Sequence, residues 1–250
     1  MSFAVWRLEW SLHRARPRRL LWSVGIPLLL LAPVAASDAA AAHRSAVYVV
    51  FPVFFGVFGG AIPLIRGGER GWIERIALTG YGVRRWVLER AAAHAVQDLV
   101  QLAPALACVL WLEGTHEAVL LAGTAAAALV ALAAANLLGA LVAGAVRSVA
   151  EGALVSATVG IVAVHLTGAF RPGAGAWATV ADASPFRPLL LAVRRVAYTG
   201  DPGALAAAAG SGPEAAVWLS AAGALTGLAA GTWALAPTLV GRLTGRGRTL

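Results

Sequence analysis

Residues 66–90, RGGERGWIERIALTGYGVRRWVLER, form a charged stretch between two long apolar runs and contain six of the chain's twenty arginines. In the middle of the stretch, Trp72, Ile73 and Ile76 recur at helical spacing on one face. The charged residues Glu69, Arg70, Glu74 and Arg75 fall elsewhere. This pattern predicts a short amphipathic surface helix held between two membrane spans. Such a helix can rest in the lipid headgroups or dock into a soluble partner, and we expect the partner.

The composition places the chain among polytopic membrane proteins. Its 250 residues are 59% hydrophobic and only 13% charged, which is too apolar for an ordinary soluble domain. Several runs approach the roughly 20 apolar residues that a membrane-spanning helix requires. The net charge of +8 comes entirely from arginine, because the sequence has no lysine. The arginines cluster at the ends of apolar runs, so membrane topology explains them better than nucleic-acid binding does.

The sequence lacks the residue patterns of the common enzyme classes. Without lysine there is neither a Walker A motif nor Schiff-base chemistry. The five histidines are scattered, the lone Cys108 cannot form an intrachain disulfide, and no HExxH or GxSxG motif occurs. We therefore expect no enzymatic activity, no metal and no cofactor bound by this chain.

The hydropathy pattern predicts one all-α transmembrane domain over residues 1–250, with six spans. They are expected at residues 20–36, 46–65, 86–111, 118–146, 152–170 and 214–240. Residues 1–19 are too polar for a cleavable signal peptide. Phe3, Trp6 and Trp10 recur there at helical spacing, which predicts a helix lying flat at the membrane interface. A disordered basic tail is the alternative.

The distribution of arginine orients this map. With the amino terminus in the cytoplasm, fifteen of the twenty arginines lie on the inner side. Both termini are therefore expected in the cytoplasm.

The connection between the fifth and sixth spans, residues 171–213, is unusually long. Residues 189–193 are apolar but too short to span, and Pro185 and Pro188 precede them. A short re-entrant helix that dips into the outer leaflet fits this segment. A simple extracellular loop is the alternative.

Three stretches carry a resemblance to a known family. ERGWIERIALTGYGVRRWVLER (69–90), HLTGAFRP (165–172) and SPFRPLLLAVRR (184–195), in this order, resemble segments of the permease subunits of type-2 ABC exporters. The resemblance implies a flat helix at residues 1–19, a cytoplasmic coupling helix at residues 67–80, and re-entrant outer helices before the sixth span. The alanine-rich residues 204–212 depart from the family pattern.

The resemblance also implies partners and a location. Two permease subunits, identical or paralogous, would pair in the lipid of a bacterial cytoplasmic membrane. Two copies of a separate ABC ATPase would bind beneath them and carry the ATP and Mg²⁺. The complex would export a hydrophobic or amphipathic compound: a drug, a secondary metabolite, a lipid or a glycan. The residues expected in a cleft of the ATPase are Glu69, Arg70, Trp72, Ile73, Glu74, Arg75 and Ile76.

Two further sets of residues are candidates for function inside the membrane. His94 and Asp98 lie four residues apart on one face of the third span, as a polar lining or a structural pair, and Asn136 of the fourth span is expected to bridge helices. His165 is expected at the outer interface. A candidate translocation path, or alternatively a packing stripe, consists of Phe51, Phe54, Phe55 and Phe58.

Two other classes of function compete with export. A membrane anchor or sensor could recruit a soluble protein through the same charged stretch without transporting anything. An intramembrane enzyme is less favoured, because the sequence shows no convergent set of catalytic residues.

Overall fold

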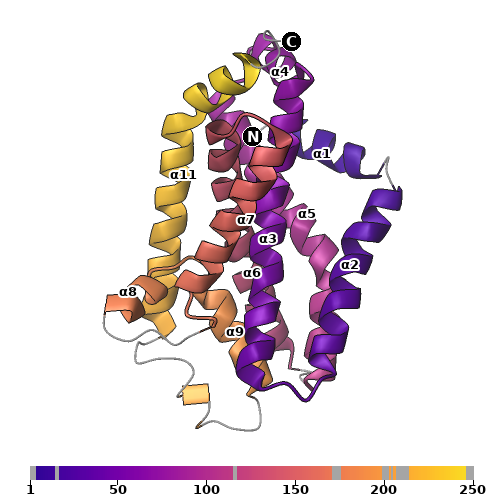
Figure 1. Ribbon diagram of the computed structural model, residues 1–250, viewed down its shortest axis with the longest axis vertical. Helices are drawn as coiled ribbons and strands as arrows, with labels where there is room; N and C mark the ends of the chain where they lie inside the picture. The colour runs from indigo at the N-terminus through magenta and orange to yellow at the C-terminus, as the bar shows by residue number, and fades with distance from the viewer. Residues whose placement is uncertain are drawn as a thin grey trace.

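The structure is a computed structural model that describes residues 4–14, 17–114, 117–170, 176–198, 203, 205–206 and 214–245. Within these ranges the chain forms α-helices and no strand, so the expectation of an all-α chain is confirmed for them (Figure 1). Five of the helices are long and apolar enough to cross a membrane. They are α3 (Ala41–Glu69), α5 (Val83–Leu112), α6 (Ala118–Ala145), α7 (Val149–Leu166) and α11 (Glu214–Gly245).

The remaining helices are shorter. The segment expected to hold the first span forms α2 (Pro17–Ala35), whose apolar part is shorter than the five long helices. The others are α1 (Ala4–Arg14), α4 (Trp72–Leu78), α8 (Ala176–Asp182) and α9 (Arg187–Ala197). Helix α9 is thus longer than the apolar run at 189–193, and most of the alanine-rich stretch 204–212 lies outside the described residues.

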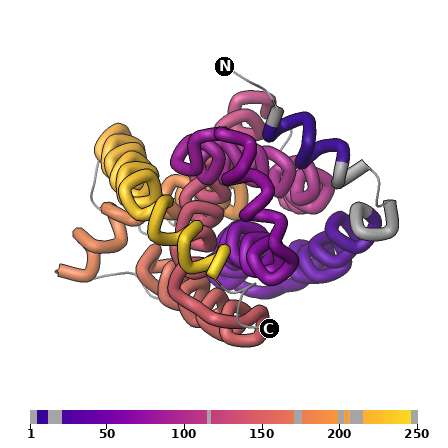
Figure 2. The backbone as a smooth tube through the Cα atoms, turned by 90° about the horizontal axis from the view of Figure 1, so that it is seen from above, coloured from indigo at the N-terminus to yellow at the C-terminus, as the bar shows by residue number. Residues whose placement is uncertain are grey.

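The short helices mark the two ends of the bundle. Helix α1 lies across the same end as α4 and the carboxyl end of α11, whereas α8 and α9 lie at the opposite end (Figure 1). Seen from above, α2 and α11 stand on opposite sides of the bundle (Figure 2). The long helices between them carry the core.

The tightest crossing joins α3 to α6 through small residues. A Cβ added at Gly60 would overlap the backbone oxygen of Asn136, and one added at Gly139 would overlap the backbone oxygen of Val57. Gly56 meets Ala135 in the same way. Residues four apart on each helix therefore let the two backbones touch, as small residues do in membrane helix pairs.

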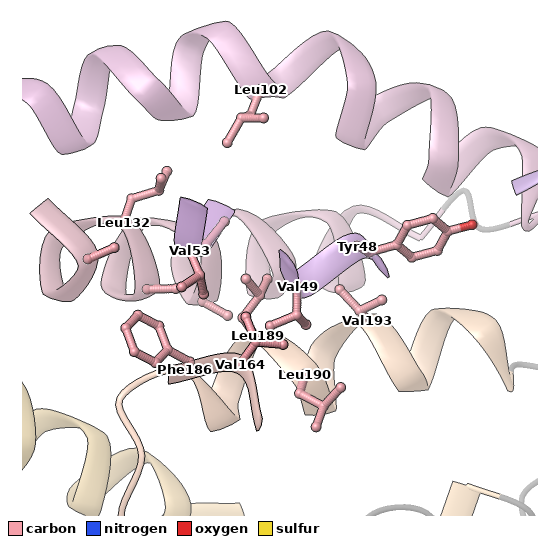
Figure 3. Packing of buried hydrophobic residues seen from close by; sticks show 14 of the residues in the cluster. Tyr48, Val49, Val53, Leu102, Leu132, Val164, Phe186, Leu189, Leu190 and Val193 are labelled. Atoms are coloured by element: carbon pink, nitrogen blue, oxygen red, sulfur yellow. The ribbon is translucent and has the colours of Figure 1, made fainter. Parts of the chain in front are cut away.

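Apolar side chains fill the space around this crossing. Figure 3 shows Tyr48, Val49 and Val53 of α3 between the helix that carries Leu102 (α5) and residues of α9, with Leu132 of α6 beside Val53. From α9 and the turn before it, Leu189, Leu190 and Phe186 are buried at 2% exposure or less. Helix α9 is therefore part of the core and not a loosely attached loop.

The predicted coupling segment at residues 67–80 is divided differently in the structure. Helix α3 runs past the expected end of the second span to Glu69, and α4 begins only at Trp72. Gly67 and Gly68 stay helical because their bare backbone packs closely: a Cβ at Gly68 would lie 2.8 Å from the backbone oxygen of Leu243.

Two glycines set the turns on either side of α4. Gly71, just before the helix, has φ of 65°, and Gly80, just after it, has φ of 72°. Residues with a Cβ adopt this left-handed conformation at a cost, so glycine fits both positions. Helix α4 is consequently a separate two-turn element that is joined to α3 by a very short turn.

Candidate functional site

An open cavity of about 980 Å³ lies on the side of α3 that faces α2 and α5. Its lining includes Ser23 of α2, Glu9 of α1 and Trp72 of α4, so the cavity extends toward the end of the bundle that carries α1 and α4 (Figure 1). The lining residues on α3 and α4 are Phe51, Phe54, Phe55, Phe58, Gly59, Ile62, Pro63, Arg66, Gly67, Trp72 and Arg75, with Arg70 between the two helices. The other walls supply Glu9, Ser23, Arg90, His94, Asp98 and Gln101.

The four phenylalanines selected from the sequence form one wall of this cavity. All four are half-buried, while their neighbours on the opposite face of α3 are buried against α6. The rings of Phe54 and Phe58 stack with centroids 6.1 Å apart, and the ring of Phe54 also packs over Gly160 of α7. The deep part of the cavity is therefore an ordered aromatic surface.

The end of the cavity nearest α4, called its mouth below, is basic. Arg66, Arg70 and Arg75 line it, and all three side chains are exposed. Within the described part of the chain, no acidic side chain forms an ion pair with any of these three arginines. The wall on α3 thus changes from aromatic to basic between Phe51 and Arg66, a span of about 22 Å at 1.5 Å per residue.

Helix α5 supplies a polar wall opposite the phenylalanines. Arg90, His94, Asp98 and Gln101 fall on one helical face and all line the cavity, although each is at most 8% exposed. The sequence placed His94 and Asp98 on a common face, and the structure shows that each also has a partner on another helix.

The partner of His94 is Glu9 of α1, which also binds Arg90. Arg90 Nε donates to Glu9 Oε1 at 3.0 Å, and His94 Nε2 lies 3.2 Å from Glu9 Oε2. Burial by itself raises the pKa of the Glu9 carboxyl, but the contact with His94 and the charge of Arg90 outweigh burial and lower the pKa to about 2. This buried cluster fastens α1 to α5 at the basic end of the cavity.

The depressed pKa of Glu9 predicts how stability depends on pH. The Glu9 carboxyl has a pKa near 2 in the folded state and 4.5 in the unfolded chain. It therefore stabilises the fold above pH 4.5, and this contribution is lost as pH falls toward 2. We expect the stability difference between the wild type and Glu9→Gln to become smaller, by roughly 2 kcal/mol, as pH falls from 5 to 3.

Unfolding in mixed detergent micelles, followed by tryptophan fluorescence, measures this difference. Using the Glu9→Gln protein as the reference removes the titration of every other acidic group from the comparison. A difference that stays constant between pH 5 and pH 3 would contradict the assignment.

Asp98 and Asn136 form a second polar contact, between α5 and α6. Asn136 Nδ2 donates to Asp98 Oδ2 at 2.9 Å and lies 3.0 Å from the backbone oxygen of Leu132. Asn136 is fully buried, and a Cβ at Gly59 would lie 3.1 Å from Asp98 Oδ2. The glycine therefore leaves the room that this hydrogen bond occupies between α3 and α5.

Helix α4 turns its apolar face toward the protein. Ile73 is 1% exposed and belongs to a buried cluster that includes Leu243 of α11 and Val5 of α1, and Trp72 and Ile76 pack against this cluster. Ile73 was expected to contact a partner, but it is buried among the chain's own helices and serves to anchor α4.

The outward face of α4 and the turn before it carries the charged residues. Glu69, Arg70 and Arg75 are exposed and Glu74 is half-buried. Leu78, which the sequence reasoning did not select, is 86% exposed at the end of the helix. An apolar side chain flanked by charges at this end of the bundle is a surface suited to docking.

The opposite end of the bundle is held by a different ion pair. Glu113, at the end of α5, pairs with Arg44 of α3, Nε to Oε1 at 2.9 Å, and accepts a hydrogen bond from the hydroxyl of Tyr48 at 3.0 Å. Arg187 donates to the backbone oxygen of Thr167 at 2.9 Å and thereby fixes α9 to the end of α7. His165 is exposed at that end of α7.

Sequence reasoning missed Glu9, Arg90 and the arginine mouth as parts of one site. Glu9 was overlooked because α1 was assigned from its tryptophans and arginines. One signal was available: Arg90, His94 and Asp98 recur every four residues on α5, and such a polar stripe in an apolar helix requires partners. Within the described residues, no group of three or more histidine, cysteine or acidic side chains is placed to hold a metal ion.

No model of a known protein family matches this sequence, and no curated protein matches it either.

Proposed function

We propose that this chain is the membrane permease subunit of an ATP-driven exporter, working as a pair above two copies of a separate ATPase. The observation that carries the proposal is the form of α4. Its apolar face is locked into the bundle, and its other face presents Leu78 and charged residues at one end of the molecule. A helix anchored in this way can receive a force and transmit it to the long helices.

Two further features support a six-span permease. Helix α2 has 19 residues, which corresponds to about 28 Å and approaches the roughly 30 Å of a bilayer core. Its exposed side chains include Leu21, Trp22 and Leu29, as expected for contact with lipid. Helices α8 and α9 sit at the end opposite α4, where the proposal places the short outer helices.

The distribution of arginines between the two ends of the bundle also agrees with the proposal. The α6–α7 turn with Arg147 lies near the end of α11, because Arg242 reaches the backbone oxygen of Gly144 at 3.4 Å. These arginines join Arg66, Arg70 and Arg75 at the end that carries α4. That end is therefore proposed to face the cytoplasm.

Energy for transport must come from another subunit, because the chain has no lysine and so no Walker A motif. Contact with the ATPase is assigned to exposed residues that do not line the cavity: Glu69 and Leu78, with the half-buried Glu74 beside them. Trp72, Ile73 and Ile76 are assigned to holding α4 in place. The substrate is proposed to be hydrophobic or amphipathic, since the cavity joins an aromatic wall to charged groups.

Purification of the tagged chain from its native membrane tests the proposal. The wild type is expected to carry a subunit with a Walker A motif and to hydrolyse ATP in the presence of Mg²⁺. Two variants are expected to insert normally but to co-purify with less of that subunit, by a factor of about ten or more. They are the double variant Glu69→Arg with Glu74→Arg and the single variant Leu78→Asp. Arg7→Glu, an exposed charge change on α1, is the control and is expected to retain it.

The alternatives predict other results. A membrane anchor or sensor would carry a partner without a Walker A motif, and binding of that partner would not support ATP hydrolysis. Full retention of the ATPase by the α4 variants would contradict the docking surface. A native protein that is active alone, with no nucleotide-hydrolysing subunit, would overturn the proposed function.

A further inference from the structure

The cavity beside α3 combines two surfaces that are rarely joined by chance. Its deep wall is built from half-buried phenylalanines, and its mouth is built from exposed arginines without acidic partners in the described part of the chain. Ile62 and Pro63, which lie between Phe58 and Arg66 on α3, also line the cavity, as do Glu9 and His94. A ligand that fits this sequence of surfaces has an apolar tail and a negatively charged head.

The net charge of the lining favours an anion. Arg66, Arg70, Arg75 and Arg90 contribute four positive charges, and among the lining residues that the structure describes the carboxylates are Glu9 and Asp98. Glu9 is neutralised by its contact with Arg90 at 3.0 Å, and Asp98 lies deeper, at the level of Gly59. The three arginines of the mouth therefore remain available to a head group.

Arginine also narrows the chemistry of that head group. The planar guanidinium matches the oxygens of a phosphate in a bidentate geometry, and basic pockets between membrane helices at the cytoplasmic leaflet bind phosphate head groups. Trp72 lines the same mouth, and tryptophan rings favour the level of the lipid head groups.

The length and opening of the cavity favour a membrane lipid over a compact soluble compound. Its lining runs about 22 Å along α3 from Phe51 to Arg66, a large part of the roughly 30 Å of a bilayer core. Its volume of about 980 Å³ lies at the top of the roughly 300–1,000 Å³ that is usual for compact ligands. Helix α2, which borders the opening, exposes Leu29 and Leu30 outward, so lipid chains would lie directly beside it.

We propose that this cavity is a binding site for one anionic phospholipid of the leaflet next to α4, with its phosphate at Arg66, Arg70 and Arg75 and an acyl chain along Phe51, Phe54, Phe55 and Phe58. The assignment is independent of whether the lipid is transported. It requires neither ATP nor a second protein.

Binding of fluorescent lipids to the purified full-length chain in a neutral detergent tests the site. The probes are phosphatidylglycerol and phosphatidylcholine with identical chains, and the chain-free head group glycerophosphoglycerol is the competitor. The wild type is expected to bind phosphatidylglycerol about 10- to 100-fold more tightly than phosphatidylcholine. The chain-free head group is expected not to compete at equal concentration.

Two sets of variants separate the head-group site from the chain site. Arg66→Gln, Arg70→Gln and Arg75→Gln together are expected to abolish the preference for phosphatidylglycerol, because the affinity for this anionic lipid falls much further than the affinity for the zwitterionic phosphatidylcholine. The double variant Phe51→Ala with Phe55→Ala is expected to lower the affinity for both lipids by about tenfold or more. Size-exclusion profiles establish that each variant is folded.

A control with the same loss of charge removes three other exposed arginines at the same end: Arg7→Gln, Arg84→Gln and Arg147→Gln. This control is expected to keep the preference. The proposal is overturned if the control loses the preference equally, if the mouth variant keeps it, or if the chain-free head group competes as well as the lipid. Because the assay contains no ATPase, none of these outcomes depends on the proposed export function.

Discussion

Replacing Gly60 with valine is expected to force α3 away from α6 and to destabilise the folded bundle by at least about 3 kcal/mol, the upper end of the usual cost of overpacking. The reason is that a Cβ at Gly60 meets the backbone of Asn136, including its oxygen, Cα and carbonyl carbon. Backbone atoms in the middle of a long helix cannot rotate away as a flexible side chain can. The two helices must therefore separate.

The free energy of unfolding in mixed detergent micelles, obtained from a denaturing-detergent titration, measures this effect. Gly223→Val on α11 is the matched control, because no atom lies within 4 Å of a Cβ at that position. Equal unfolding midpoints for the two variants would contradict the close α3–α6 crossing. Gly139→Val, on the other helix of the pair, is expected to behave like Gly60→Val.

Replacing Arg90 with methionine is expected to cost about 3–5 kcal/mol, because it leaves the Glu9 carboxylate buried without its cationic partner. Glu9 is 7% exposed and Arg90 is 5% exposed, so the remaining charge is largely shielded from water. The double variant Glu9→Gln with Arg90→Met is expected to recover a large part of this loss, since no buried charge is then unpaired.

A second ion pair on the same helix provides the control. Arg85 and Glu89 lie 2.7 Å apart at the surface, where solvent screens their attraction. Arg85→Met is therefore expected to change stability very little. An equal loss of stability in Arg90→Met and Arg85→Met would contradict the role of the buried cluster in fastening α1 to α5.

Local features of the fold could be predicted from the sequence because they depend on nearby residues. The long helices follow from continuous apolar runs, and the apolar face of α4 follows from the spacing of Trp72, Ile73 and Ile76. The helix ends were less predictable. Helix α3 continues through Gly67 and Gly68, and Gly68 packs there against Leu243, which is far away in the sequence.

The separate parts of the site could be selected from the sequence, but their proximity in the fold could not. The phenylalanine stripe, the charged stretch and His94 with Asp98 were each selected separately, and the structure brings the stripe, both polar residues and part of the charged stretch to one cavity. The missing information was long-range: Glu9 reaches His94 across 85 positions of the chain, and no periodicity encodes such a pairing. For the same reason the sequence did not show which way the apolar face of α4 points, because this depends on where the distant helix α11 packs.

The very short turn at Gly71 has a mechanical consequence. It leaves almost no slack between α4 and the last turn of α3, which carries Arg66 and leads into Arg70. Pro63 removes one backbone hydrogen bond just before that turn, so the end of α3 can tilt without moving the whole rod. If α4 docks a partner and the cavity holds a lipid as proposed, both occupants act on the last turn of α3, and each is then expected to alter the affinity of the molecule for the other.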